Sequence, residues 1–149
     1  MKQRVIKQKY ILVYDLCLND NRLKDEAERL AKIHDVKIVA VDGALKCPYA
    51  QKNISNAGPV EFVNLIKNAD FVVTNSFHAS AFSVIFNRPF SVFYKQKNIS
   101  RMADFLHYVG LERCLNSDSP IYDFDWTKVN AQLHEMCQNS IQYLSSNLN

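Results

Sequence analysis

Short apolar runs alternate with longer segments of helical periodicity, and this alternation restricts the fold more than any other feature of the sequence. The runs are YILVY (10–14), VKIVAV (36–41), DFVVT (70–74) and FSVFY (90–94). Each is apolar almost throughout and rich in residues that favour strands, which predicts buried strands. Strands of this kind, separated by helices, form mostly parallel sheets covered on both faces. The sequence therefore predicts an α/β fold with a mostly parallel sheet.

Five segments between and after these runs have helical periodicity. Asn19 or Asp20 can cap the first helix, and Gly58-Pro59 opens the second, since proline is tolerated at the first helical position. The expected ranges are 21–33, 59–68, 78–87, 100–109 and 126–148. The third helix is expected to turn Phe82, Ile85 and Phe86 inward. The predicted apolar stripe of the last helix is Val129, Leu133, Cys137, Ile141 and Leu144.

Residues 43–57 have no clear periodicity and are predicted to be a loop. No internal repeat or domain boundary is visible, so residues 1–149 are expected to form a single domain.

Composition excludes several classes of site. The chain has 149 residues and a formal net charge of +3, without the clustered basic stripe of a nucleic-acid-binding protein. Gly43, Gly58 and Gly110 are too far apart for a glycine-rich phosphate loop. The four cysteines form no C-x-x-C pair, so their spacing gives zinc no support.

The chain is expected to work in the cytoplasm. It has no signal peptide and no apolar run near the roughly 20 residues that a membrane span needs. Reduced cysteines in a cytoplasm are the simplest interpretation.

Ligands of open α/β sheets bind beyond the carboxyl ends of the strands, where the following helices begin. In this sequence that rule indicates Asp15, Asp42, Thr74–His78 and Tyr94–Lys97.

The turn Thr74–Ser80 carries the strongest candidate residues. Unpaired amides at a helix start and the helix dipole favour a phosphate or carboxylate there. Asn75 and Ser76 can cap the helix or donate to such a ligand. Histidine titrates near neutral pH, so His78 is a candidate for proton transfer. The simpler interpretation is a surface or structural histidine, with Ser76 acting only as a cap.

Two parts of the sequence resemble a known family. The stretch Gly58-Pro-Val-Glu-Phe-Val, continued by Asn68-Ala-Asp-Phe-Val-Val-Thr-Asn-Ser-Phe-His-Ala-Ser-Ala-Phe-Ser-Val-Ile-Phe-Asn-Arg-Pro-Phe90, is similar to the polysaccharide pyruvyl transferases. Asn98-Ile-Ser-Arg101 and Val109-Gly-Leu-Glu-Arg113 resemble the next landmark of that family. The likeness is specific over Ala69–Phe90 and looser elsewhere.

The resemblance implies a fold and a reaction. The family has the two-domain architecture of type-B glycosyltransferases, and this chain resembles only the C-terminal half, a three-layer α/β/α Rossmann-like domain. The N-terminal domain that would complete the cleft is missing, so the chain alone is expected to be inactive. The family transfers a pyruvyl group from phosphoenolpyruvate to two hydroxyls of a glycan, without a further cofactor, and releases phosphate. The family's histidine, taken as its general acid or base, corresponds to His78.

Several other residues are candidates for substrate binding under this resemblance. Arg101 is expected to hold one anionic group of the donor, with Lys95 or Lys97 beside it, since the arginine fork suits carboxylate and phosphate. Solvated loop lysines are the simpler interpretation of the latter two. Glu61 is a candidate for acid–base work or a sugar hydroxyl, but a first-turn glutamate is also favoured by the helix dipole. Asp15 and Asp42 are weaker, positional candidates.

The sequence departs from the family's patterns at the turn. Many members have Arg-Leu-His, whereas Ser76 and Phe77 precede His78 here, so an anion-binding arginine is absent. Another common form is Ser-Phe-His-Gly-Thr; Ala79 still permits close approach, and Ser80 keeps a hydroxyl for substrate. The first departure leaves the identity of the donor open.

Three alternatives remain beside the pyruvyl transferase prediction. A type-B glycosyltransferase that uses a nucleotide sugar would have a similar crevice. A binding half without activity would keep the fold. A receiver-like signalling domain is disfavoured, because Asp15 stands alone and no aspartate ends the third strand run.

Overall fold

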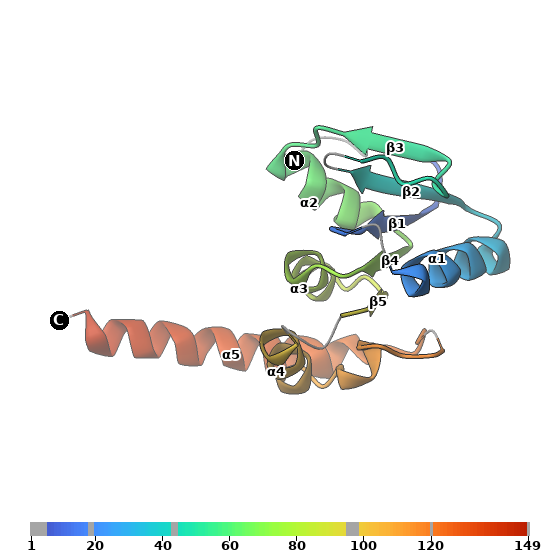
Figure 1. The fold of residues 1–149 in the computed structure, drawn as a ribbon. Helices are drawn as coiled ribbons and strands as arrows, with labels where there is room; N and C mark the ends of the chain where they lie inside the picture. Colours follow the sequence, from blue (N-terminus) through green and yellow to red (C-terminus); the bar gives the residue numbers. More distant parts are fainter. Residues whose placement is uncertain (1–5, 18–19, 43–44, 95–98, 120, 149) are drawn as a thin grey trace.

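Five parallel strands form one sheet in the computed structural model, which describes residues 6–17, 20–42, 45–94, 99–119 and 121–148. The strand order is β3-β2-β1-β4-β5, and all four neighbouring pairs are parallel (Figure 1). The strands are β1 (Tyr10–Tyr14), β2 (Lys37–Asp42), β3 (Lys52–Ser55), β4 (Phe71–Thr74) and β5 (Phe90–Val92). The prediction of a mostly parallel α/β sheet is confirmed.

The five predicted helices are present, with ends that differ by only a few residues from the expected ones. They are α1 (Asn21–His34), α2 (Pro59–Asn68), α3 (Phe77–Ile85), α4 (Ser100–Tyr108) and α5 (Trp126–Asn147), with a short 3-10 turn η2 (Glu112–Cys114) between the last two. Asp20 is the residue that caps α1, and its carboxylate accepts a hydrogen bond from the amide of Arg22. Of the described helices, none has both the length and the apolar character needed to cross a bilayer.

Helices cover both faces of the sheet. On one face, Leu23, Ala27 and Leu30 of α1 pack against alternate residues of the strands, including Ile11 and Val73. On the other face, side chains of α2, α3, α4 and α5 pack against the remaining strand residues in a second core cluster. Since both faces are covered, the strands are apolar on both sides, which is the pattern in the sequence.

The prediction that residues 43–57 are a loop is wrong for Lys52–Ser55. These residues form β3, an edge strand that pairs with β2, with Val39 opposite Lys52 and Val41 opposite Ile54. Its side chains are half-buried or exposed. An edge strand has one unpaired side and needs no continuous apolar run, so the hydrophobic pattern did not reveal it.

The face that α3 turns to the sheet also differs from the prediction. Phe82 and Phe86 do pack against the core, but the side chain of Ile85 is 51% exposed. The fully buried positions are instead Ala79, Ser80, Ser83 and Val84. The two serine hydroxyls donate to backbone carbonyls four residues earlier in the helix, so neither needs water. Small side chains thus let α3 lie close to the sheet.

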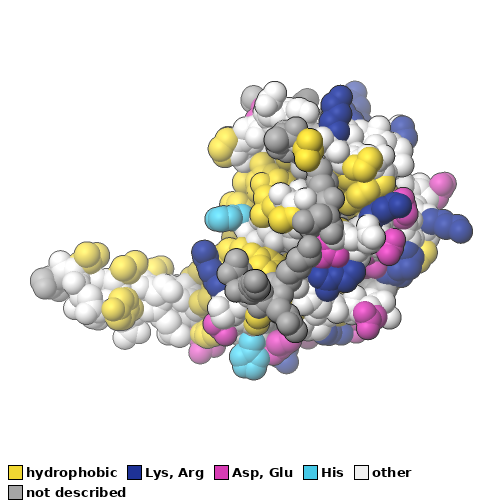
Figure 2. Space-filling model, viewed as in Figure 1, with side chains coloured by type: hydrophobic (Ala, Val, Ile, Leu, Met, Phe, Trp, Pro, Cys, Tyr) yellow, Lys and Arg dark blue, Asp and Glu magenta, His cyan; other side chains and the backbone are white. Residues whose placement is uncertain are grey.

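The last helix leaves the body of the protein after its first turns (Figure 1). Val129 is buried and Leu133 is half-buried, as predicted, but Ile141 and Leu144 are 57% and 54% exposed, and Cys137 is exposed as well. Hydrophobic side chains are visible along the projecting part of α5 in Figure 2. The predicted stripe therefore reaches the core only at its beginning.

The winding of the chain reverses between β1 and β4, which are neighbours in the sheet. From β1 the chain passes to β2 and β3 on one side, and it returns through α2 to continue with β4 and β5 on the other. In sheets of this kind the connections that follow the two central strands separate and leave a crevice at their carboxyl ends.

Candidate functional site

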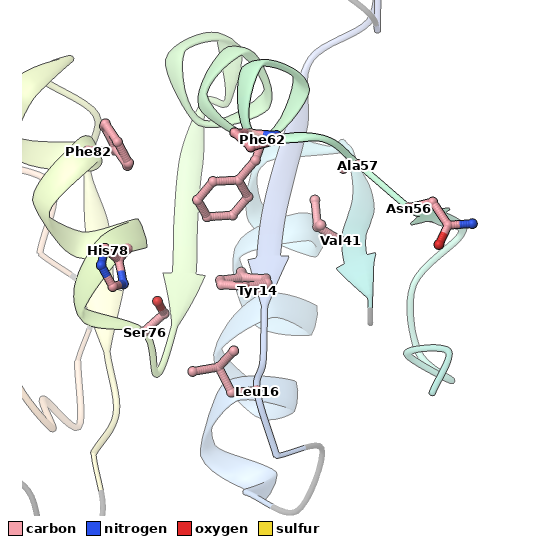
Figure 3. Close-up of a pocket in the computed structure, with 10 residues that line it drawn as sticks. Tyr14, Leu16, Val41, Asn56, Ala57, Phe62, Ser76, His78 and Phe82 are labelled. Atoms are coloured by element: carbon pink, nitrogen blue, oxygen red, sulfur yellow. The ribbon is translucent and has the colours of Figure 1, made fainter. Parts of the chain in front are cut away.

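A cleft of about 600 Å³ lies at the carboxyl ends of β1 and β4 (Figure 3). Its side chains come from β1 and the residues after it, from β2, from the β3–α2 connection, from α2, and from α3 and the residue before it. The lining residues are Tyr14, Leu16, Val41, Asn56, Ala57, Pro59, Phe62, Ser76, His78 and Phe82. The cleft therefore occupies the position at which sequence reasoning expected a ligand.

Three aromatic side chains, which we call the aromatic wall, form one side of the cleft. The rings of Tyr14 and Phe62 meet edge to face with centroids 4.8 Å apart, and Phe62 meets Phe82 in the same way at 6.5 Å. In Figure 3, Phe62 lies above Tyr14, and α3 with Ser76 and His78 lies beside them. Edge-to-face contacts hold the three rings in fixed orientations.

The turn between β4 and α3 is built by short polar side chains. The hydroxyl of Thr74 donates to the carbonyl oxygen of Tyr14 at 2.7 Å and accepts from the amide of Ser76 at 3.0 Å. The hydroxyl of Ser76 then accepts from the amide of Ala79 and caps α3. Ser76 thus has the structural role that was its simpler interpretation, and it also lines the cleft.

His78 is exposed and lines the cleft at the second residue of α3. Its ring makes an edge contact with the ring of Phe77, with centroids 6.0 Å apart, and it makes no hydrogen bond with any residue that the structure describes. The amides of Phe77 and His78 likewise bond to no described group. An imidazole and two amides at a helix start are therefore available to one ligand.

Asn75 points back to the residues after β1 instead of into the cleft. Its amide donates to the Asp15 carboxylate at 2.7 Å, and its carbonyl oxygen accepts from the amide of Leu16 at 2.9 Å. The same oxygen of Asp15 accepts from the amide of Cys17. Asp15 and Asn75, both predicted candidates, therefore bond to each other. Their contact joins the connection after β1 to the connection after β4 beside the cleft.

Ser80 and Glu61 are also engaged within the protein. Ser80 is fully buried, and its hydroxyl donates to the carbonyl oxygen of Ser76 at 3.0 Å. The Glu61 carboxylate accepts the amide of Gly58 at 3.0 Å and so closes the start of α2. A Cβ atom on Gly58 would lie 2.7 Å from that carboxylate, so a larger residue there would displace the glutamate. Neither side chain lines the cleft.

Arg101 comes from the first turn of α4 and stacks on α3. Its guanidinium lies 4.1 Å from the ring centroid of Phe77, the residue before His78. The structure therefore brings the predicted arginine to the start of α3, although Arg101 is exposed and is not among the lining residues of the cleft. Lys95, Lys97 and the side chain of Asp42 lie outside the described residues.

The described side chains that line the cleft carry little charge. The described residues that line it include no lysine or arginine, so among them His78 and the amides of α3 are the donors for an anion, together with polar groups such as Asn56. Among the described residues, no three side chains of His, Cys, Asp or Glu come together as a metal site would require. The arrangement can bind one anionic group at α3 and place a proton donor beside it.

Sequence reasoning missed the aromatic wall and Asn56. From the sequence, Tyr14 is expected only in a strand and Phe62 only in a helix. Asn56 follows β3, the strand that was not predicted, and has a left-handed φ of 61°, a conformation that asparagine tolerates better than most residues. An asparagine two residues before Gly58-Pro59 was the available signal.

The chain is similar to two solved structures, of which the first supports this fold. The UDP-GlcNAc 2-epimerase from Methanocaldococcus jannaschii matches with a TM-score of 0.53 at 21% sequence identity, over 88% of this chain and 39% of the epimerase. The glycotransferase of kitacinnamycin matches with a TM-score of 0.49 at 15% identity, over 91% of this chain and 36% of that one. The likeness to the epimerase shows the fold, that of one part of a type-B glycosyltransferase-like architecture.

The chain spans well under half the length of these two structures. No curated protein sequence matches it at a significant level.

A sequence model of one family covers more than half of the chain. The model of the polysaccharide pyruvyl transferases matches residues 2–95, which include the strands, the aromatic wall and the turn that carries His78. Arg101 and the segment Val109–Arg113 lie beyond the match. The chain belongs to the polysaccharide pyruvyl transferase family.

Proposed function

We propose that this chain provides the donor-binding part of an enzyme that transfers a pyruvyl group from phosphoenolpyruvate to two hydroxyls of a glycan. The products are a cyclic ketal and inorganic phosphate. The observation that carries the proposal is the position of His78, exposed in the cleft at the start of α3, within the segment that matches the family. No cofactor takes part.

His78 acts as the acid in the first step. It donates a proton to the methylene carbon of the donor, which becomes a methyl group and leaves an oxocarbenium-like carbon beside it. A sugar hydroxyl attacks this carbon and loses its proton to a base. The bond from this carbon to the phosphate oxygen then breaks, and the second hydroxyl closes the ketal. One of the two released protons restores His78, and the other leaves with phosphate.

The amides of Phe77 and His78 are proposed to hold one anionic group of the donor. We propose that Arg101 binds the other anionic group of the donor. Its guanidinium is kept near α3 by its contact with Phe77. Fixed donors of this kind stabilise charge in the transition state without reorganisation. Ser76 shapes the turn, whereas the buried Ser80 supports it from within.

The aromatic wall supports a glycan as the acceptor. Aromatic rings offer a flat apolar surface to the C–H face of a sugar, and the wall lies in the same cleft as His78. The chain spans 39% of the epimerase, so we propose that further polypeptide completes the acceptor pocket. The 149 residues alone are then expected to give no turnover; turnover would contradict this part of the proposal.

The test is phosphate release by the complete enzyme with phosphoenolpyruvate and candidate glycans. We expect His78→Ala to lower kcat by about 10²–10⁴-fold, the usual contribution of a general acid. The control is His134→Ala, which removes another exposed histidine, on α5. Both variants should keep the wild-type thermal unfolding midpoint. An unchanged rate in His78→Ala would exclude the histidine from the mechanism.

The same assay distinguishes pyruvyl transfer from the main alternative, a type-B glycosyltransferase. A type-B glycosyltransferase would release a nucleotide from a nucleotide sugar and would leave phosphoenolpyruvate untouched. Cytoplasmic location is part of the proposal, since all four cysteines are unpaired in the structure, which suits a reducing compartment.

A further inference from the structure

A second cavity lies at the opposite, amino-terminal edge of the sheet. It has a volume of about 300 Å³ and is lined by residues at or just before the starts of β1, β2 and β3. Lys9, Lys37 and Lys52 contribute its charged groups, and Ile6, Tyr10 and Val39 contribute apolar surface. We call it the basic cavity.

The register of the sheet brings two of these lysines together. Lys37 pairs with Tyr10 across β1 and β2, and Lys52 pairs with Val39 across β2 and β3. Paired residues of neighbouring strands share a face, and so do residues two positions apart in one strand. Lys37 and Lys52 therefore project from the same face as Tyr10 and Val39, and the cavity is a product of the fold.

Among the described residues, the lysines in the basic cavity have no acidic partner. No acid is among the described lining residues, and none of the three lysines makes an ion pair with a residue in that part of the chain. Asp70, at the same edge, accepts a hydrogen bond from the amide of Tyr10 and does not line the cavity. All three lysines are exposed, and like charges around one cavity repel one another, which a bound anion would offset.

The floor of the basic cavity is fixed. Tyr10 is 1% exposed, and its hydroxyl donates to the carbonyl oxygen of Leu65 at 2.6 Å. The side-chain oxygen of Gln51 accepts the amide of Ile38 at 2.7 Å, so the glutamine also has a set position. A rigid floor with cationic groups around it suits a small, multiply charged ligand.

We propose that the basic cavity binds a phosphate-bearing anion with more than one negative charge. Lysine binds phosphate as a compact point charge, and several lysines together favour a polyanion over a simple monoanion. The volume sits at the lower end of the range for ligand pockets, which fits a group the size of a diphosphate. The site is separate from the cleft at His78, so it does not depend on the proposed reaction.

The test is calorimetric titration of the full chain with pyrophosphate at constant ionic strength. We expect the double variant Lys37→Gln/Lys52→Gln to bind at least about tenfold more weakly, since two charged contacts are lost. The matched control is Lys24→Gln/Lys32→Gln, which removes two exposed lysines from α1. The double variant should lose the same affinity in a His78→Ala background as in the wild-type background, which separates this site from the cleft.

A second arm identifies the source of the phosphate group. Vesicles of phosphatidylcholine with phosphatidic acid are sedimented with each variant, and vesicles of phosphatidylcholine alone serve as the blank. Loss of binding to the phosphatidic acid vesicles in Lys37→Gln/Lys52→Gln assigns the site to a lipid headgroup; pyrophosphate binding without vesicle binding assigns it to a soluble compound. Equal affinities of wild type and this double variant in both arms, or an equal loss in the control, would overturn the proposal.

Discussion

Asn75, after β4, donates a hydrogen bond of 2.7 Å to the carboxylate of Asp15, after β1, and its carbonyl oxygen accepts the amide of Leu16. The two residues stand 60 positions apart in the chain. Their contact joins the two connections that flank the cleft, and together with the bond from Thr74 to Tyr14 it fixes the α3 start relative to β1.

Replacement of Asn75 by alanine should therefore loosen the cleft. Two hydrogen bonds are lost, and the amide of Leu16 is left without its partner, so we expect the free energy of unfolding to fall by about 1–2 kcal/mol. Urea denaturation measures the change. Asn130→Ala, on the exposed side of α5, is the control and should not lower stability. An Asn75→Ala variant as stable as the wild type would show that the contact is dispensable.

Arg101 should affect donor binding more than stability. The exposed contact between its guanidinium and Phe77 contributes about 0.5–1 kcal/mol, so Arg101→Ala and Arg101→Lys should unfold near the wild-type midpoint. In the complete enzyme we expect Arg101→Ala to raise the KM for phosphoenolpyruvate about tenfold or more, and Arg101→Lys to raise it less. Lys128→Gln, an exposed charge change on α5, should leave KM unchanged. Equal KM values in all variants would remove Arg101 from the donor site.

Most of the fold was predictable because its strong signals are local. The strands β1, β2, β4 and β5 are apolar on both faces and lie between helical segments, and both properties are visible in the sequence. β3 was missed because an edge strand with half-exposed residues carries no such pattern. The exposure of Ile141 and Leu144 was missed because periodicity tells which residues share a face and not whether anything covers that face.

The site was predictable in position but only partly in detail. The turn with His78 was identified from the rule for parallel sheets and from the family pattern, and the structure does place it in a cleft. The partners of Asn75, Ser80 and Glu61 depend on contacts within the folded chain. Asn75 reaches a residue 60 positions away, and Ser80 is buried because α3 packs close to the sheet. Sequence alone does not show whether a hydroxyl or amide is already satisfied inside the protein.

The cysteines should fall into two classes of reactivity. Cys17 and Cys137 are exposed, whereas Cys47 and Cys114 are buried. Burial raises the pKa of the Cys114 thiol to about 12 and also raises that of Cys47, so few thiolates form at these positions near neutral pH. At pH 8 we expect maleimide to label Cys17 and Cys137 quickly and the other two only after unfolding, as mass spectrometry of the peptides would show. Rapid native labelling of Cys114 would contradict the burial.

The raised pKa of Cys114 also predicts an alkaline loss of stability. The thiol form is favoured in the folded state, so its contribution is complete below the unfolded pKa of cysteine, near 9, and is lost as the pH rises through about 12. Denaturation measured across this range should show a smaller alkaline decrease for Cys114→Ala than for the wild type. Cys137→Ser, at an exposed position, should follow the wild-type curve.

Two leucines provide a matched test of the core. Leu106 in α4 is fully buried, and Leu144 in α5 is 54% exposed. We expect Leu106→Ala to lower the free energy of unfolding by about 2–5 kcal/mol, because a cavity replaces a packed side chain. Leu144→Ala should change it by less than about 0.5 kcal/mol. Urea denaturation of both variants checks the difference, and similar losses would mean that the far part of α5 is covered.

The reversal of winding between β1 and β4 has a consequence for how such a protein can diversify. The cleft at the sheet edge exists because the connections after β1 and β4 leave these adjacent strands in opposite directions. This arrangement does not depend on which residues the connections contain. Substitutions in the connections after β1 and β4 can change which ligand the cleft binds, while the pairing of the strands stays intact. Substrate preference can therefore change while the architecture stays the same.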